Sequence, residues 1–444
     1  QLAYHPGRHS GTPPRMSAIV WNAVRDQSGM GVRDQWNAQR ASARQRGAQK
    51  GHVGSFRELL EPDQVDQVHE VPPPAVCDCG GSVSQRGKPR RHQVFDLPPL
   101  VQPDIQEYRL YSGVCAGCGR THRAALPAGV PSGQIGPRAL ALIGVLGTQY
   151  HLTQFKIRDL LARLMGVDFS IGAISQAHGK VAAALKAPVA EATACLNQAA
   201  VLHLDETSYP REGSTSGNWV WVAAQPMTAV FSVLPSRARY VLTSLIGESP
   251  TPGGVIVSDR YSAYAHLAPE SRQVCWAHLI RDFTRISQRQ GPAGRVGRRL
   301  LGLAYVMFRW RDQGRSADDF EPLQRRVMQA LQRGIEQGRC SRTAKTCANV
   351  LKVWPALWSF LANPQIPPTN NAAEQALRSV VLKRKISGPT RSRRGDEFIA
   401  HGYTAFESCR RQGRDLLGYL HTAVLAWIDK TAAPSLMPQA VPSG

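Results

Sequence analysis

Short runs of apolar and β-branched residues recur between residues 200 and 285, and several alternate apolar with polar positions. This pattern predicts β-strands. The predicted strands are VLHLDET (201–207), GNWVWVAAQ (217–225), TAVFSVLPS (228–236), GVIVSDR (254–260) and a last one in RQVCWAHL (272–279). A helix is predicted over RARYVLTSLIGE (237–248), before the fourth strand. Three consecutive strands, then a helix and further strands, predict a mixed α/β fold that is compatible with an RNase H-like sheet.

A helical period replaces this pattern on both sides of the strands. Residues 136–195 are predicted to be helical, with Thr153 and Ser170 as N-caps. A short turn between two of these helices resembles a DNA-reading helix-turn-helix, although ordinary antiparallel helix packing gives the same pattern. Residues 290–363 are predicted to form a helical insertion within a domain that spans residues 200–430.

The two ends of the chain lack a sustained hydrophobic period. Residues 1–67 are predicted to be a basic, largely disordered arm, and residues 431–444 a disordered tail. The chain starts at Gln1 rather than Met, which suggests that its true N-terminus is missing.

The net charge and the cysteine content narrow the classes of protein. Lysine and arginine number 54 against 32 aspartates and glutamates, a formal charge of +22, which favours a polyphosphate partner over a basic protein without a nucleic-acid role. No apolar run approaches the roughly 18 residues that a membrane helix needs, and no signal peptide opens the chain. Nine cysteines in 444 residues are too sparse for a disulfide scaffold. A cytoplasmic protein with no membrane partner is the simplest interpretation.

Three acidic residues are the strongest candidates for chemistry. Asp205 and Asp259 each close an apolar run and are predicted to lie at the C-terminal ends of strands, whereas Glu374 opens a helix. Such carboxylates suit a pair of divalent cations, Mg²⁺ or Mn²⁺, that carry out in-line phosphoryl transfer on DNA. Each aspartate is also consistent with an ordinary turn or N-cap. Glu206 follows Asp205 directly, so a strand sends its side chain to the opposite face.

Glu374 has a specific structural alternative. Asn371 lies three residues before it, so the two residues resemble a capping box in which Glu374 only caps its own helix. Arg378 and Lys385 return to nearly the same helical face as Glu374 and can hold phosphate oxygens, although Arg378 is also consistent with an i,i+4 salt bridge.

A basic tract follows Glu374 and is predicted to contact the DNA backbone, the alternative being a solvated face. Its predicted DNA contacts are Arg378, Lys383, Arg384, Lys385, Arg391, Arg393 and Arg394.

Residues 68–127 are predicted to be a small β module with strands at 92–100 and 105–114. Two cysteine pairs lie at its glycine-containing turns and are predicted to bind a structural Zn²⁺, with His122 as a substitute ligand. The predicted zinc ligands are Cys77, Cys79, Cys115 and Cys118. A second short motif, Cys275-x-x-His278, is read as a buried cysteine and a satisfied histidine, yet His278 or Arg281 can still reach a scissile phosphate.

Several of these segments together resemble the insertion-sequence-sixty-six (TnpC-type) family of bacterial DDE transposases. They are HLDET, SDRYSAY, CWAHLIRDF and above all NNAAEQALRSVVLKRK, and RQRGAQKGHVG is similar to the family's basic N-terminal segment. The resemblance runs from about residue 44 to 430. Two departures are that CDCGG is one residue shorter than the usual CxxCGG, and that residues 1–43 resemble nothing in the family.

The resemblance implies an RNase H-like catalytic domain whose metal-dependent triad is Asp205, Asp259 and Glu374. It also implies binding to the terminal inverted repeats of a mobile element, strand cleavage, and strand transfer to target DNA. The implied protein is nucleoid-associated, forms a homo-oligomer on DNA and works with accessory transposition proteins. The alternatives are a catalytically inactive or domesticated DNA-binding descendant, and an RNase H-like nuclease without strand transfer.

Overall fold

The structure is a computed structural model that describes residues 59–84, 87–95, 102–213, 217–246 and 254–438. These residues belong to two units, which divide between residues 101 and 102 and are described separately. No helix in the described part of the chain is long and apolar enough to cross a membrane. Most of the predicted N-terminal arm lies outside the described residues.

The smaller unit, described over 59–84 and 87–95, has little regular structure. It contains a single 3₁₀ turn, η1 (Pro62–Gln64), and a bridge between Val76 and Ser82. The strand predicted over 92–100 is wrong for residues 92–95, and its remaining residues are not described. Instead of a backbone ladder, the Gln93 side chain bonds to the backbone N–H and carbonyl of Leu60. The unit has no buried side chains among its described residues, so a strand there would have no core against which to pack an apolar face.

The larger unit begins with a short hairpin of β1 (Ser112–Val114) and β2 (Thr121–Arg123). All six residues are exposed. The strand predicted over 105–114 therefore exists only at its last three residues, because the preceding segment has neither a pairing partner nor a core to pack on.

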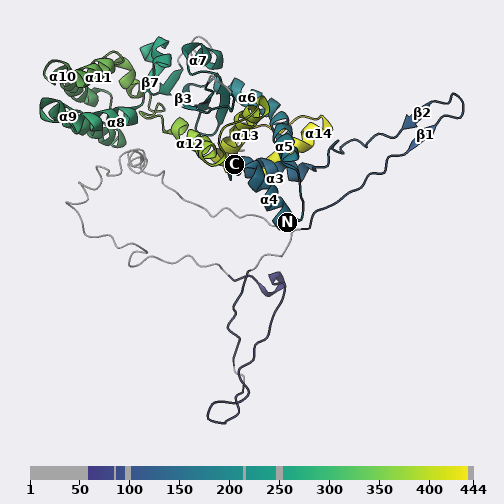
Figure 1. The fold of residues 1–444 in the computed structure, drawn as a ribbon. Coiled ribbons are helices and arrows are strands. Elements are labelled where there is room, and N and C mark those ends of the chain that lie inside the picture. Colours follow the sequence, from purple (N-terminus) through teal and green to yellow (C-terminus); the bar gives the residue numbers. More distant parts are fainter. Residues whose placement is uncertain (1–58, 85–86, 96–101, 214–216, 247–253, 439–444) are drawn as a thin grey trace. The chain divides into compact units, whose positions relative to one another are not determined.

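A five-stranded mixed sheet forms the centre of the larger unit (Figure 1). Its strands are β3 (Val201–Ser208), β4 (Trp219–Ala224), β5 (Ala229–Leu234), β6 (Val255–Ser258) and β7 (Arg272–Val274). The order across the sheet is β5-β4-β3-β6-β7, with β3, β4 and β5 antiparallel and β6 and β7 parallel to β3. The helix α7 (Arg239–Ile246) precedes β6. The mixed α/β architecture predicted from the sequence is confirmed.

Helices from both sides of the strands in the sequence share one core with the sheet. They are α3 (Pro137–Thr148), α4 (Gln154–Met165), α5 (Ile171–Ala184), α6 (Lys186–Leu196), α12 (Asn371–Ser387), α13 (Arg393–Gln412) and α14 (Leu416–Asp429). Thr153 and Ser170 cap α4 and α5 with their side chains, as predicted. The helix α5 packs against α3, α13 and α14, so the second helix of the supposed helix-turn-helix is covered. Ordinary helix packing accounts for the pattern, and DNA reading by these helices stays a prediction.

A second core continues from β6 and β7 into the predicted insertion. It is formed by α8 (Trp276–Ser287), α9 (Gly291–Asp312), α10 (Glu321–Glu336) and α11 (Ser341–Leu351), which lie together beside β7 in Figure 1. The helices α8 and α9 approach closely at Gly297, where a Cβ would lie 2.3 Å from the backbone nitrogen of Ser287. The insertion is therefore rigidly joined to the strands that precede it.

The segment after α14 is packed rather than disordered as far as residue 438. Leu436 is fully buried, Gln412 donates a hydrogen bond to its carbonyl, and the Tyr419 hydroxyl donates to the carbonyl of Pro434. The predicted disordered tail is wrong for residues 431–438, because their apolar side chains find a site on the core that local sequence does not reveal.

Candidate active site

The sequence predicted that Asp205 ends its strand, but Asp205 lies inside β3. β3 continues to Ser208 because it stays paired with β4 throughout, after its other neighbour β6 has ended at Ser258. His203 pairs with Val257, and extending this parallel register by two residues places Asp205 level with Asp259. The two aspartates therefore come from neighbouring strands at the same level of the sheet.

Asp259 follows β6 directly and starts the turn toward η2 (Ser262–His266). One of its carboxylate oxygens accepts a hydrogen bond from the backbone N–H of Tyr261 at 2.8 Å, an Asx-type turn. The guanidinium of Arg272 donates to the Asp259 carbonyl at 2.7 Å. These bonds fix the backbone at the end of the strand, which orients the carboxylate.

Glu374 lies in the first turn of α12, and its carboxylate does not cap that helix. The N-cap residue is Asn370, and no side-chain bond caps the helix. The carboxylate instead accepts a hydrogen bond from Arg281 at 3.0 Å, and His278 Nδ1 lies 3.4 Å from its other oxygen. The capping-box alternative is therefore wrong, and α8 rather than α12 holds this side chain.

Asn370 joins the start of α12 to β3 and α8. Its amide donates to the carbonyl of Leu204 at 2.7 Å and bonds to the ring of His203 at 3.1 Å. Its backbone N–H donates to the Cys275 sulfur at 3.2 Å. Asn370 is completely buried, so these bonds set the position of Glu374 relative to the strand that carries Asp205.

Glu206 points to the opposite face of β3 from Asp205. Its carboxylate accepts a hydrogen bond from the Tyr264 hydroxyl at 2.9 Å, and burial raises its pKa to about 7. Tyr264 is itself fully buried and packs edge-on against Trp221. Glu206 thus belongs to a packed aromatic face of the sheet.

The electrostatics of the site are those of uncompensated negative charge. Burial raises the pKa of Asp205, and the charges of Glu206, Glu374 and Asp259 raise it further. No described residue forms an ion pair with Asp205 or Asp259. Neighbouring carboxylate oxygens of this kind are the donors that hard divalent cations prefer.

The carboxylates do not yet converge on one point. Among the described residues, the single group whose ligand atoms all lie within 4.8 Å of one another is Cys275, His278 and Glu374. That trio is a poor metal site, because burial raises the pKa of the Cys275 thiol to about 12 and the Arg281 guanidinium lies on the same carboxylate. The carboxylates of Asp205, Asp259 and Glu374 offer the oxygen donors that hard divalent cations prefer, and Arg281 lies on the third of them.

The Cys275-x-x-His278 motif has a clear structural role. Cys275 is fully buried and receives the Asn370 N–H, as the structural interpretation predicted. His278 and Arg281 are three residues apart on α8, and Arg281 contacts both His278 and Glu374. The sequence contained this signal, since i,i+3 positions share a helical face, but only the fold shows that Glu374 lies opposite.

The basic tract is divided between buried and exposed side chains. Lys383 is buried and donates to the carbonyl of Leu152 at 2.8 Å, and burial lowers its pKa to about 8. Its prediction as a DNA contact is wrong, because its ammonium group is buried and already bonded to the backbone between α3 and α4. Arg384 is half-buried and bonds to Ser208 at the exposed end of β3.

The other predicted DNA contacts lie at the surface. Arg391 and Arg393 are exposed and pair with Glu212 and Glu397, respectively. The remaining exposed members are Arg378, Lys385 and Arg394. Arg378 makes no ion pair with Glu374, so the i,i+4 alternative is not realised.

The two cysteine pairs lie in different units, which are not placed relative to each other. Each pair closes a tight turn: the Cys77 N–H bonds to the Gly81 carbonyl, and the Cys115 N–H to the Arg120 carbonyl. The pKa of Cys79 is lowered by the Gly81 N–H and by Cys77, and that of Cys115 by the backbone N–H groups of Cys118 and Gly117. These turns favour thiolates, the form that binds metal. A shared zinc ion stays a prediction.

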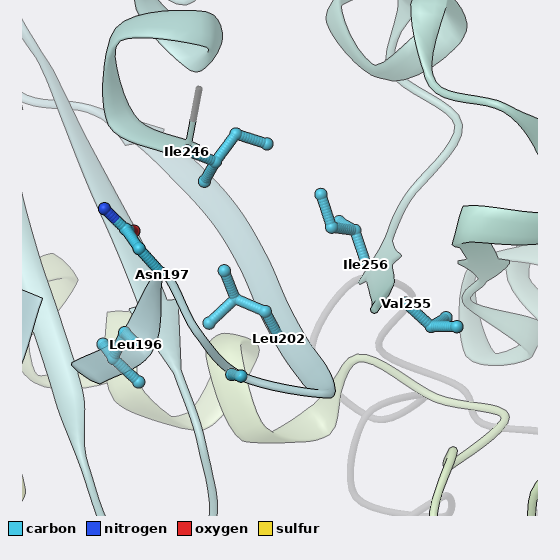
Figure 2. Close-up of a pocket in the computed structure, with 7 residues that line it drawn as sticks. Leu196, Asn197, Leu202, Ile246, Val255 and Ile256 are labelled. Carbon is cyan, nitrogen blue, oxygen red and sulfur yellow. The ribbon is translucent and has the colours of Figure 1, made fainter. Parts of the chain in front are cut away.

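A small cavity lies on the other face of the sheet and is unrelated to the acids. Its volume is about 10 Å³, and Figure 2 shows Leu202, Ile246 and Ile256 around it. Leu202 points away from the face of Asp205, since an odd number of positions, three, separates them along the strand. An apolar hole of this size holds one water at most, so it is a packing defect and not a ligand site.

Comparison with known proteins identifies relatives for most of the chain. The family model described as "Transposase IS66 family" matches residues 132–397, from the start of the helices before the sheet to the first turns of α13. An "Uncharacterized protein y4hP" of Sinorhizobium fredii is 26% identical over 403 residues, 81% of this chain and 72% of that protein. The "Uncharacterized protein y4qI" of the same organism is 24% identical over 410 residues, 83% and 72% of the two chains.

Proposed function

Because the chain belongs to the IS66 family of transposases, we propose that it cleaves DNA at the ends of a mobile element and joins them to target DNA. The proposed catalytic residues are Asp205, Asp259 and Glu374. The observation that supports this proposal is that Asp205 on β3 and Asp259 just after β6 lie at the same level of the sheet, close enough to Glu374 for their charges to interact. No described residue forms an ion pair with either aspartate.

The sheet supports an RNase H-like assignment for the catalytic domain. An antiparallel meander of β3, β4 and β5 is extended on the other side of β3 by two parallel strands, β6 and β7. The first acid lies in the central strand, the second at the end of its parallel neighbour, and the third on a helix anchored to the central strand by Asn370. This placement uses a strand interior, a strand end and a helix start, which hold side chains more accurately than loops do.

The donor set fits Mg²⁺ or Mn²⁺, which would supply the positive charge that in-line displacement at a phosphodiester requires. Asp205 and Asp259 offer oxygens that no described cation occupies. Glu374 completes the set by turning away from Arg281. The guanidinium of Arg281, released from its carboxylate, then lies within the site to hold a phosphate oxygen.

The four cysteines belong to the same proposal. We propose that these cysteines bind Zn²⁺. Each pair forms a turn that favours thiolates, and neither segment has a core of its own. Family membership supports DNA as a partner. The homo-oligomer on two DNA ends and the accessory transposition proteins are part of the proposal. Metal analysis of the purified protein tests the zinc directly.

The acids are tested by strand transfer with pre-cut element ends and Mg²⁺. Asp205→Asn, Asp259→Asn and Glu374→Gln should each reduce cleavage and strand transfer by at least about a thousandfold, since each removes a ligand charge. DNA binding should persist. Glu206→Gln is the matched control. Glu206 is the strand neighbour of Asp205, but its carboxylate accepts a hydrogen bond from Tyr264 on the opposite face, so this variant should retain most of the activity.

The same assay separates the alternatives. An active Glu374→Gln protein would remove Glu374 from the site. Cleavage without joining in the wild type would favour a nuclease, and DNA binding without either activity would favour an inactive descendant of a transposase.

A further inference from the structure

A groove lined by arginines lies between α9 and α10 of the helical insertion, away from the acids. Its volume is about 800 Å³. Five arginines and only one acidic residue line it: Arg295, Arg299, Arg326, Arg333, Arg339 and Glu336. All five arginines are exposed. Like charges gathered in one hollow repel one another unless an anion joins them, so the groove is built for a negatively charged ligand.

The spacing of these arginines arranges them in two rows. Arg295 and Arg299 are one turn apart on α9, and Arg326 and Arg333 are two turns apart on α10. Each pair therefore lies on one face of its helix, at separations of about 6 and about 10 Å along the axis. The two helices pack against each other, so the rows border the same groove.

Arg339 completes the groove from a strained backbone position. Its φ is 47°, in the left-handed region that glycine and asparagine adopt more easily. It follows Gly338, where a Cβ would lie 2.5 Å from the carbonyl of Gly334, so the end of α10 is tightly constrained. An arginine is thus held at the groove at some conformational cost.

The groove arginines are also unoccupied. None of the five side chains makes an ion pair or hydrogen bond with another residue in the described part of the chain. Other arginines of the insertion do have such contacts: Arg289 donates to Thr343, Arg311 to the Pro364 carbonyl, and Arg315 lies over the Trp310 ring. The difference shows that the groove side chains are available to a ligand.

We propose that this groove binds the sugar–phosphate backbone of duplex DNA, as a contact separate from the basic tract after Glu374. Guanidinium groups bind phosphate oxygens in a bidentate manner, and two rows on two helices can contact several phosphates at once. A single free phosphate can use at most a few of these arginines, so the length of the rows favours a polymer. The choice of DNA rests on the proposed function.

The position of the groove gives this contact a mechanical role. α9 and α10 pack on the same core as Val257 and Val274 of β6 and β7. DNA held there is therefore in a fixed relation to Asp259, which follows β6. Backbone contacts position a duplex without reading its sequence, so the groove contributes affinity and orientation rather than recognition of the element ends.

The test compares the full chain with Arg299→Ala/Arg326→Ala/Arg333→Ala. The control is Arg309→Ala/Arg325→Ala/Arg342→Ala, which removes three exposed arginines of the same helices and α11 that lie outside the groove. Binding of element-end and random duplexes is measured against salt concentration. The groove variant should lower the slope of log affinity against log salt by about 2 to 3, equally for both duplexes, because each lost phosphate contact lowers it by about 0.9. The control should change the slope by less than about 1.

Two further measurements keep the outcome decisive. Phenylglyoxal modification of the wild type should be suppressed at the groove arginines by duplex DNA, and not by inorganic phosphate at the same ionic strength. Protection by phosphate alone, an unchanged slope, or an equal loss in the control would overturn the proposal. Asp205→Asn should be inactive in strand transfer but bind DNA with at least the wild-type salt slope. Adding the groove changes to Asp205→Asn should then lower this slope, which tests the groove independently of the proposed catalytic function.

Discussion

The acidic site and the arginine groove hold their charges in opposite ways. At the acidic site, Glu374 is half-buried and accepts a hydrogen bond from Arg281, and the neighbouring Asn370 is completely buried and hydrogen-bonded. In the groove, five exposed arginines have no partners among the described residues. A buried charge needs hydrogen bonds or ion pairs from the protein around it, whereas an exposed charge is stabilised by water.

This difference predicts different responses to mutation. Changes near the acids should affect folding stability or metal affinity, because their side chains are parts of a packed network. Changes in the groove should leave stability almost unaltered and act only on DNA affinity.

The largest effect is expected from Asn370→Ala. This change leaves the Leu204 carbonyl and the His203 ring without their partner in a buried place, which should lower the free energy of unfolding by about 3 kcal/mol. Urea denaturation measures it. Asn363→Ala is the control, because that side chain only accepts a local bond from Gln365, and it should cost less than about 1 kcal/mol. Equal losses would show that Asn370 is no special anchor.

Lys383 tests the same comparison within the basic tract. Burial lowers its pKa to about 8 in the folded protein, from an ordinary value of 10.5, so the folded state disfavours the charged ammonium. This penalty is complete below pH 8 and disappears as the pH rises toward 10.5, where the unfolded chain also loses the proton. The wild type should therefore gain about 3 kcal/mol of stability relative to Lys383→Met over that window.

Denaturation of both proteins between pH 7 and 10.5 measures this gain. Lys385→Met is the exposed neighbour for comparison and should show no such dependence on pH. A flat difference between wild type and Lys383→Met would mean that Lys383 reaches water.

The smallest effect is expected from the ion pair between Arg281 and Glu374. If Arg281 competes with a divalent cation for this carboxylate, Arg281→Ala should tighten the binding of Mn²⁺ by about fivefold, on the order of 1 kcal/mol. Calorimetric titration of the DNA-free protein measures it. Arg285→Ala is the control, since Arg285 lies one turn further along α8 and pairs with Asp282. Weaker Mn²⁺ binding in Arg281→Ala would mean that Arg281 positions the carboxylate for the metal instead.

The predictions that succeeded from sequence depend on neighbours within a few residues. The side-chain caps at Thr153 and Ser170, the three-stranded meander, the helical insertion and the cysteine turns are all local patterns. The opposite directions of Asp205 and Glu206 follow from strand geometry in the same way. Such features are determined by propensity and hydrogen bonds that the segment itself contains.

The predictions that failed depend on residues far apart in the chain. Asp205 lies inside its strand because β4 extends the pairing, and Lys383 is buried because the carbonyl of Leu152 reaches it. Leu436 is ordered by a core that other helices form. No local sequence pattern predicts which distant part of the chain a segment packs against.

The sequence by itself therefore determined the elements, the mixed fold and the identity of the three acids as candidates. The tertiary structure decided the environment of each charge: the bond of Arg281 to Glu374, the burial of Lys383, and the position of two arginine rows along one groove. The physical reason is that hydrogen bonds within a helix or turn are settled by adjacent residues. The burial of a charge depends on which distant elements pack around it.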